Sequence, residues 1–214
     1  MNSKISALLA TLLVAAAPLA GAANVAAGAA VTTAPATGSG FGLSAGWAGA
    51  APADPSTLTD GAFVADGQQW NTGTVFWQGA GSDTADTITI ALGGAASVTG
   101  LFLQGDNNDI YSVSYEDLGG TWHALAALGP HGSIDPTYNG GGGVYWGMGT
   151  ASTSFAAVTA QAFQITAGGD GSYAVSEFQA TGEFLPAVPE TGTSALMLAG
   201  LASLGLIARR RSVR

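Results

Sequence analysis

Residues 86–122 decide the fold, and they read DTITIALGGAASVTGLFLQGDNNDIYSVSYEDLGGTW. Apolar side chains alternate with small or polar ones in residues 87–92 and again in residues 110–115. This period of two is typical of a β-strand that buries one of its faces. Turn-forming residues separate the apolar runs at positions 93–94, 105–109 and 116–120. The stretch therefore predicts short strands joined as two hairpins in tandem, with a further strand beginning at Trp122.

The composition of the whole chain agrees with this pattern. Glycine is frequent, at 33 of 214 residues, and no long stretch outside the two ends shows the apolar stripe of an amphipathic helix. Short strands separated by turn residues predict an all-β fold, a single-domain sandwich or barrel. The length suits one such domain with additional segments at its ends.

Basic residues lie only near the two ends of the chain, whose formal net charge is −9. Residues 24–188 contain neither lysine nor arginine. Without these side chains a domain cannot bind phosphate by bidentate contacts or release counterions from a nucleic acid. We therefore exclude nucleic acid and anionic lipid as partners, and neutral ligands and cations remain. The absence of cysteine excludes disulfides and thiolate metal sites.

No motif in the sequence makes a convincing case for catalysis. Fourteen carboxyl groups form pairs by chance, and the two histidines occur without an HExxH motif. The pattern GxSxG occurs once, as GLSAG at residues 42–46, but it stands in the Ala, Gly, Pro and Thr-rich stretch 26–55 and not between a predicted strand and a predicted helix. We therefore expect no enzymatic activity and no catalytic residue.

The first residues have the pattern of a secretory signal. Lys4 supplies a positive charge, residues 5–17 are apolar, and small residues precede a cleavage site near Ala22 or Ala23. A membrane-spanning anchor is the alternative, but the apolar run is short and ends at small residues. The sequence predicts that residues 1–23 are removed on export.

The C-terminal segment, residues 188–214, has three parts in order. The short motif of Val188, Pro189 and Glu190 precedes an apolar run at 194–208, shorter than the ~20 residues of an ordinary membrane helix. The final part is basic and contains Arg209, Arg210 and Arg211. Arginines after such a run keep the end of a segment cytoplasmic.

This arrangement resembles the PEP-CTERM sorting signals that exosortases process in Gram-negative bacteria. Thr191 departs from that pattern, because its commonest version has a second proline there. A sortase signal of the LPxTG type and a plain tail anchor are the alternatives. The resemblance implies an exosortase-type processing enzyme as partner, a short hydrophobic sorting helix and transient association with the inner membrane. It also implies final placement on the envelope surface or in the extracellular matrix.

Three stretches together resemble the galactose-binding-like β-sandwich of the discoidin and coagulation-factor C type. They are the DNNDIY sequence at 106–111, the opening at 24–32 and the closing stretch YAVSEF at 173–178. The resemblance implies a jelly-roll sandwich at 24–182, followed by a linker at 183–187. Residues 26–55 are then an irregular first strand and loop, although their Ala, Gly, Pro and Thr content is also typical of a flexible linker.

The same resemblance implies a structural calcium ion that joins an early Asp-Gly turn to a glutamate on the closing strand. Asp60 and Glu177 stand at those two positions, and Asp66 adds a carboxylate in the same loop. Residues 106–109 form a rival cluster of the oxygen ligands that calcium prefers. Aspartate and asparagine also favour turns without any metal.

A binding rim is predicted around the glycine-rich loop at 129–146. A saccharide site needs an aromatic ring beside amide or carboxyl groups, and Tyr138 with Asn139 supplies both. The further residues predicted for this rim are Tyr145, Trp70, Trp122 and His123. We expect a surface or matrix module that binds neutral saccharides of an envelope or exopolysaccharide. The alternative is a structural matrix or surface-layer protein without a discrete ligand.

Overall fold

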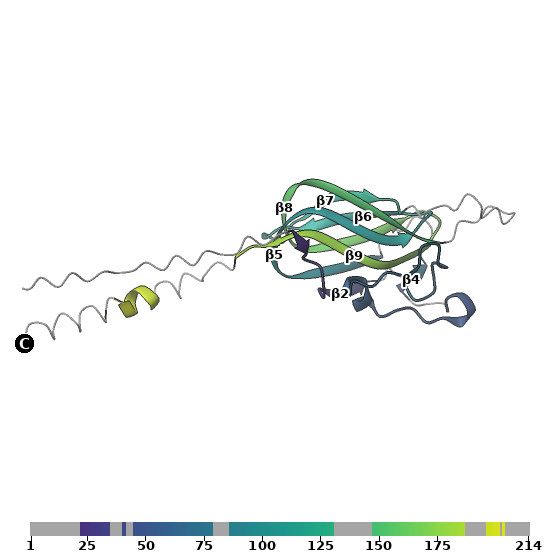
Figure 1. The fold of residues 1–214 in the computed structure, drawn as a ribbon, viewed down its shortest axis with the longest axis horizontal. Helices are drawn as coiled ribbons and strands as arrows, with labels where there is room; N and C mark the ends of the chain where they lie inside the picture. Colours follow the sequence, from purple (N-terminus) through teal and green to yellow (C-terminus); the bar gives the residue numbers. More distant parts are fainter. Residues whose placement is uncertain are drawn as a thin grey trace, which may run out of the picture.

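The computed structural model of the protein describes residues 22–34, 40–41, 45–78, 86–130, 147–186, 196–201 and 203. Antiparallel β-strands make up most of this part of the chain, together with two short 3-10 helices (Figure 1). The elements in chain order are β1 (Ala23–Asn24), β2 (Ala30–Ala34), β3 (Gly40–Phe41), η1 (Trp47–Gly49), η2 (Pro55–Thr59), β4 (Val75–Gln78), β5 (Thr87–Asp106), β6 (Ile110–Glu116), β7 (Trp122–Leu128), β8 (Met148–Gly168) and β9 (Ser172–Phe184).

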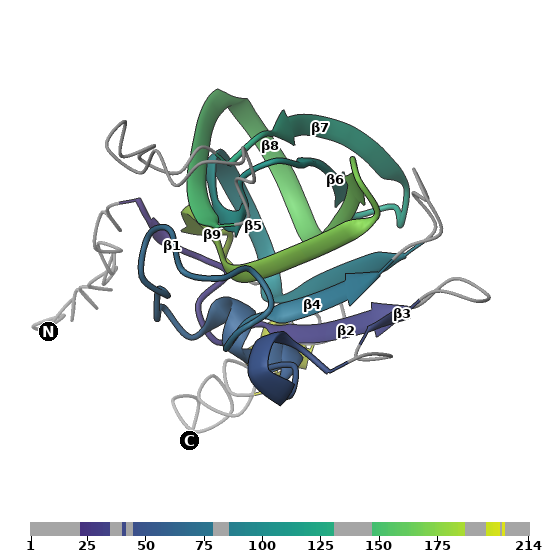
Figure 2. The same cartoon turned by 90° about the vertical axis from the view of Figure 1, so that its right-hand side faces the viewer.

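Two long strands, β5 and β8, connect two packed layers. In layer 1 the order is β2, the first half of β5, the second half of β8, β6 and β7. In layer 2 the order is β3, β4, β9, the second half of β5 and the first half of β8. Figure 2 shows β6, β7 and β8 on one side of the molecule and β4 on the other. The predicted all-β sandwich is thus confirmed.

The hydrophobic core lies between the two layers, and side chains from both meet there. The ring of Phe163 in layer 1 lies 5.4 Å from that of Phe178 in layer 2, and the rings of Tyr111 and Trp77 are 6.5 Å apart. All four side chains are fully buried. Large aromatic side chains bury the most apolar surface per residue, so these contacts stabilise the closed sandwich. Trp77 is therefore a core residue.

The prediction of two tandem hairpins is wrong in its first half. Gly93 and Gly94 do not end a strand, because β5 continues through them for 20 residues. The pairing of β5 with β8 shifts register between Ala91 and Ala96, and neither glycine has a positive φ. The two glycines therefore lie in an irregular part of one strand, where β5 passes from layer 1 to layer 2. Strands β6 and β7 do form a hairpin, whereas the second half of β5, which precedes β6, lies in layer 2 and β6 lies in layer 1.

The turns gather at two opposite ends of the sandwich. The hairpin end is the end that contains the turn at 117–121, after which β7 begins. Strand β7 ends at Leu128, which lies opposite Tyr111 near the start of β6, at the other end of the sandwich. The turns at 107–109 and 169–171 also lie at that other end, because Ile110 pairs with Gly168. We call it the acidic end. Seven residues of strand separate the two ends by roughly 20 Å.

The segment before β4 covers part of layer 2. The side-chain amide of Gln104 donates to Val64 O and accepts from Val64 N–H, both at 3.0 Å. Near the N-terminus, Asn24 Oδ1 accepts from Ala180 N–H at 3.1 Å. Strands β1 and β2 pair with β9 and β5, so the described residues up to 34 form the predicted irregular opening rather than a linker.

Only short parts of the two chain ends belong to the described residues. Residues 196–201 and 203 are helical and exposed, which does not test a sorting role. Among the helices that the structure describes, none has the length and apolar character needed to cross a membrane. The predicted signal segment, apart from residues 22 and 23, lies outside the described residues. So do the sorting residues Val188, Pro189, Glu190, Arg209, Arg210 and Arg211.

Candidate functional sites

The acidic end contains two buried carboxyl groups from the turn between β5 and β6. Asp106 is 1% exposed and Asp109 is 3% exposed. Asp109 Oδ1 accepts a hydrogen bond from Asp170 N–H at 3.1 Å, and Asn108 Nδ2 donates to Asp170 Oδ2 at 3.0 Å. A side chain at Gly169 would overlap the Asp109 carboxylate. The turns at 107–109 and 169–171 therefore pack directly against each other.

Burial and mutual repulsion raise the pKa values of these carboxyl groups. Burial, with the charges of Asp109 and Asp170, raises the pKa of Asp106 to about 8. Burial also raises the pKa of Asp109 to about 6. No lysine or arginine occurs between residues 24 and 188 to compensate these charges. Buried carboxylates without a cation are unfavourable, so this end of the molecule favours a proton or a metal ion.

The predicted calcium pair of Asp60 and Glu177 lies elsewhere, on the outer side of layer 2. Glu177 Oε2 accepts from Gly61 N–H at 3.3 Å and Glu177 Oε1 accepts from Gln179 Nε2 at 3.1 Å. Asp60 Oδ1 accepts from Ala62 N–H at 2.7 Å. Burial raises the pKa of Glu177, and Asp60 adds to the rise. The structure therefore brings the Asp60 turn and Glu177 together, as the sequence predicts.

These contacts fit a calcium ion only in part. Asp60 is exposed, whereas Glu177 is buried and both of its oxygens already accept hydrogen bonds. Asp66 is exposed in a separate turn. In the part of the chain that the structure describes, no three acidic or histidine side chains are grouped as metal ligands. Calcium between Asp60 and Glu177 stays a prediction.

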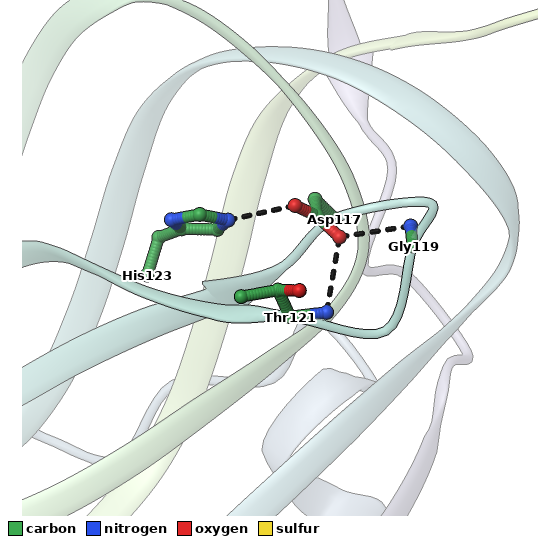
Figure 3. A network of polar contacts seen from close by, with 4 residues as sticks. All are labelled: Asp117, Gly119, Thr121 and His123. Carbon is green, nitrogen blue, oxygen red and sulfur yellow. Dashed lines mark hydrogen bonds and ion pairs between the residues drawn. The ribbon is translucent and has the colours of Figure 1, made fainter.

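The hairpin end is organised by Asp117. Its Oδ1 accepts from Gly119 N–H at 2.8 Å and Thr121 N–H at 3.0 Å, while its Oδ2 lies 2.7 Å from His123 Nε2 (Figure 3). The hydrogen bond from His123 is the main cause that lowers the pKa of Asp117. The His123 ring stacks on Tyr115 at 5.1 Å. His123 thus closes the β6–β7 turn, and its ring has one face against Tyr115.

Trp122 points to the opposite face of β7, because successive side chains of a strand alternate. It is 38% exposed and pairs with Glu116 across the hairpin. We call this surface the outer face of layer 1. Along strands β5, β6 and β8, the side chains of this face alternate with the buried Ile88, Val113 and Ile165, which point to the core. The outer face of layer 1 includes the side chains of Thr32, Thr87, Thr89, Ala91, Ser112, Ser114, Glu116, Trp122, Ala124, Gln164 and Thr166.

The described members of the predicted rim, Trp70, Trp122 and His123, do not all lie at one end of the sandwich. Trp122 and His123 lie at the hairpin end, whereas the loop at 129–146 leaves β7 at the acidic end. Trp70 does lie beside this loop, because Gln69 pairs with Gly147. Its ring is only 7% exposed and packs edge-on against Phe76 at 5.8 Å, so it cannot offer a face to a ligand. Tyr138, Asn139 and Tyr145 lie outside the described residues.

Two polar residues that the sequence prediction missed lie on the same outer face as Trp122: Glu116 is its cross-strand partner in β6, and Gln164 lies in β8 opposite Ser114. The sequence pattern was sufficient to place both residues. Glu116 directly follows Tyr115, which shares one face of its strand with Val113, and Gln164 stands between the apolar Phe163 and Ile165. Alternation alone therefore places each of them on the solvent side of a half-buried strand.

Comparisons with known proteins give distant structural likeness only. No protein-family model and no curated protein matches the sequence. A fucose-binding module of Streptococcus pneumoniae is 15% identical, with 76% of this chain and 96% of that chain covered and a TM-score of 0.44. A chitosan-binding module of a Paenibacillus sp. IK-5 chitosanase/glucanase is 17% identical, with 74% of this chain and 98% of that chain covered and a TM-score of 0.43. Discoidin II of Dictyostelium discoideum is 12% identical, with 79% of this chain and 62% of that chain covered and a TM-score of 0.41. At these scores the likeness carries no argument about function.

Proposed function

We propose that this chain is a carbohydrate-binding module that holds a neutral saccharide on the outer face of layer 1. The observation that carries the proposal is the exposed ring of Trp122 at the edge of a face without basic side chains. A sugar ring presents an apolar C–H face and a fringe of hydroxyl groups, and it binds where an aromatic ring adjoins hydrogen-bonding groups. Trp122 is the aromatic ring of this site.

Polar groups for the sugar hydroxyls come from the neighbouring strands. Glu116 is the cross-strand partner of Trp122, and opposite side chains of a sheet lie about 5 Å apart. Gln164 is paired with Ser114 and with Thr89, so an amide and two hydroxyl groups lie in one row. Glu116 would repel an anionic ligand, and no lysine or arginine could hold one. The ligand class is therefore a neutral saccharide.

Three predictions from the sequence complete the proposal. The protein is exported, processed at its C-terminal segment by an exosortase-type enzyme and placed on the envelope surface or in the extracellular matrix of a Gram-negative bacterium. Tyr138, Asn139 and Tyr145 form a second contact with the saccharide. Calcium between Asp60 and Glu177 is the alternative to a calcium ion at the rival cluster 106–109, and it would tie the segment before β4 to β9.

Replacing Trp122 by alanine should weaken binding to a neutral polysaccharide about tenfold, because it removes the aromatic plate; tenfold corresponds to about 1.4 kcal/mol. Isothermal titration of the full chain against neutral and acidic polysaccharides measures this effect. The dissociation constant for the neutral ligand should barely change with salt, because screening acts on charges.

Phe184→Ala is the matched control, because Phe184 is also an exposed aromatic residue but lies at the end of β9 in layer 2. It should bind as the unmodified protein does. Preference for acidic polymers, or equal binding by the Trp122→Ala variant, would contradict the proposal. Binding to no polymer at all would favour a structural matrix protein.

Processing is tested separately. Replacing Pro189 and Glu190 by alanine should leave an uncut precursor in the inner membrane of the producing bacterium, because these residues belong to the proposed recognition motif. Mass spectrometry of the exported protein measures the C-terminus. An intact Arg214 on the exported, unmodified protein would show that the tail is not removed.

A further inference from the structure

We propose that the acidic end is a binding site for a divalent metal ion of the calcium type, held between the carboxylates of Asp106 and Asp109. This site is distinct from the saccharide-binding face, which the length of β7 separates from it. It is also distinct from the Asp60 and Glu177 pair on layer 2.

Two buried oxygen atoms without hydrogen-bond partners point to a missing positive ligand. Asp106 Oδ1 and Asp109 Oδ2 are buried, and neither accepts a hydrogen bond from the part of the chain that the structure describes. Buried polar atoms are nearly always paired, and an unpaired one is costly. Both atoms belong to side chains that are at least 97% buried. A cation between them would satisfy both acceptors at once.

The chemistry of the surroundings favours a hard cation over a basic side chain. The sequence has no lysine or arginine in residues 24–188, and the described residues contain a single histidine, His123, at the other end of the sandwich. Calcium takes six to eight oxygen ligands, including main-chain carbonyls and water. Asp106 and Asp109 would supply two carboxylates of such a set. Because no three acidic side chains are grouped as ligands among the described residues, main-chain oxygens and water would complete it.

The hydrogen bonds around the two carboxylates define what the ion would hold together. Asp109 connects its own turn to Asp170 in the β8–β9 turn at 3.1 Å. Asn107 N–H donates to Gly147 O, just before β8, at 3.0 Å. An ion at Asp106 and Asp109 would therefore fasten the crossing from β5 to β6 against both ends of β8. It would stabilise the folded state by binding that state alone.

Adding CaCl2 to the metal-free full chain should raise the melting temperature by about 5 to 10 °C at a hundredfold excess over the dissociation constant. Isothermal titration should give one site per chain. Asp106→Asn should lose most of the rise in melting temperature, since it removes one carboxylate and keeps the shape. Asp109→Asn should behave in the same way and serves if the first variant folds poorly.

Glu177→Gln is the matched control, because it neutralises the buried carboxylate of the other predicted calcium site. It should keep the full response to calcium. A response lost in Glu177→Gln and kept in Asp106→Asn would overturn the inference in favour of the layer 2 pair. An unmodified protein whose melting temperature and titration heats do not respond to CaCl2 would overturn it as well and would leave Asp106 as a protonated carboxyl group. Saccharide binding at Trp122 can fail or succeed independently of these outcomes.

Discussion

Replacing Gly182 by alanine should destabilise the protein by about 3 kcal/mol, because the added methyl group meets main-chain atoms that cannot rotate away. Gly182 lies in β9 opposite Val98 of β5. A Cβ atom there would overlap Ser97 O and lie 3.0 Å from Val98 Cα. The strands β5 and β9 would have to separate near the end of β9. Urea unfolding measures the loss, and a fall in melting temperature of roughly 6 to 12 °C should accompany it.

Gly93→Ala is the control for this prediction. Gly93 is likewise a strand glycine, in β5, and has no positive φ, but nothing lies within 4 Å of an added Cβ atom. Its stability should stay within about 0.5 kcal/mol of that of the unmodified protein. If Gly182→Ala were as stable as Gly93→Ala, the close packing of β9 on β5 would be wrong.

Without divalent metal, the stability of the protein should fall as the pH rises from about 5 to about 8. The folded-state pKa of Asp106 is raised from 3.8 to about 8, so the folded state holds a proton that the unfolded state has released. Stability falls with pH wherever the folded state binds more protons. At about 1.4 kcal/mol for each pH unit, the loss over these three units is about 4 kcal/mol. Urea unfolding in EDTA at several pH values measures it.

Asp106→Asn should remove most of this slope, because asparagine does not titrate. Asp117→Asn is the comparison, since Asp117 is a carboxylate of the same kind whose pKa is lowered instead. The contribution of Asp117 is present above its ordinary pKa and is lost only as the pH falls through the lowered value. The Asp117→Asn variant should therefore keep the slope between pH 5 and 8. If the metal-free protein were equally stable at pH 5 and pH 8, the raised pKa of a buried Asp106 would be wrong.

Local alternation was enough to predict the strands but not their partners. The buried Ile88, Ile90, Tyr111 and Val113 follow from a period of two. The passage of β5 through Gly93 does not, because glycine ends some strands and bends others. Whether β5 turns back or crosses to the other layer depends on pairing with β8 and β9. Those strands lie 50 residues or more further along the chain, where local patterns carry no information.

The candidate sites divide in the same way. The proximity of Asp60 to Glu177 was predicted from a resemblance and is present in the structure. Trp122 and His123 were predicted as neighbours on one rim, although alternation already places them on opposite faces of β7. The burial of Asp106 could not be predicted, because aspartate in a turn is ordinarily exposed. It results from the approach of the β8–β9 turn, where Gly169 leaves room for the Asp109 carboxylate.

The most direct test of saccharide binding on layer 1 is a nuclear magnetic resonance titration of the full chain with a neutral oligosaccharide that the isothermal titrations show to bind. Signals from the Trp122 indole N–H and the Gln164 side-chain amide should shift together. The indole signals of the buried Trp70 and Trp77 should stay in place. Shifts confined to residues 131–146, with Trp122 and Gln164 unchanged, would contradict the placement of the ligand on the outer face of layer 1.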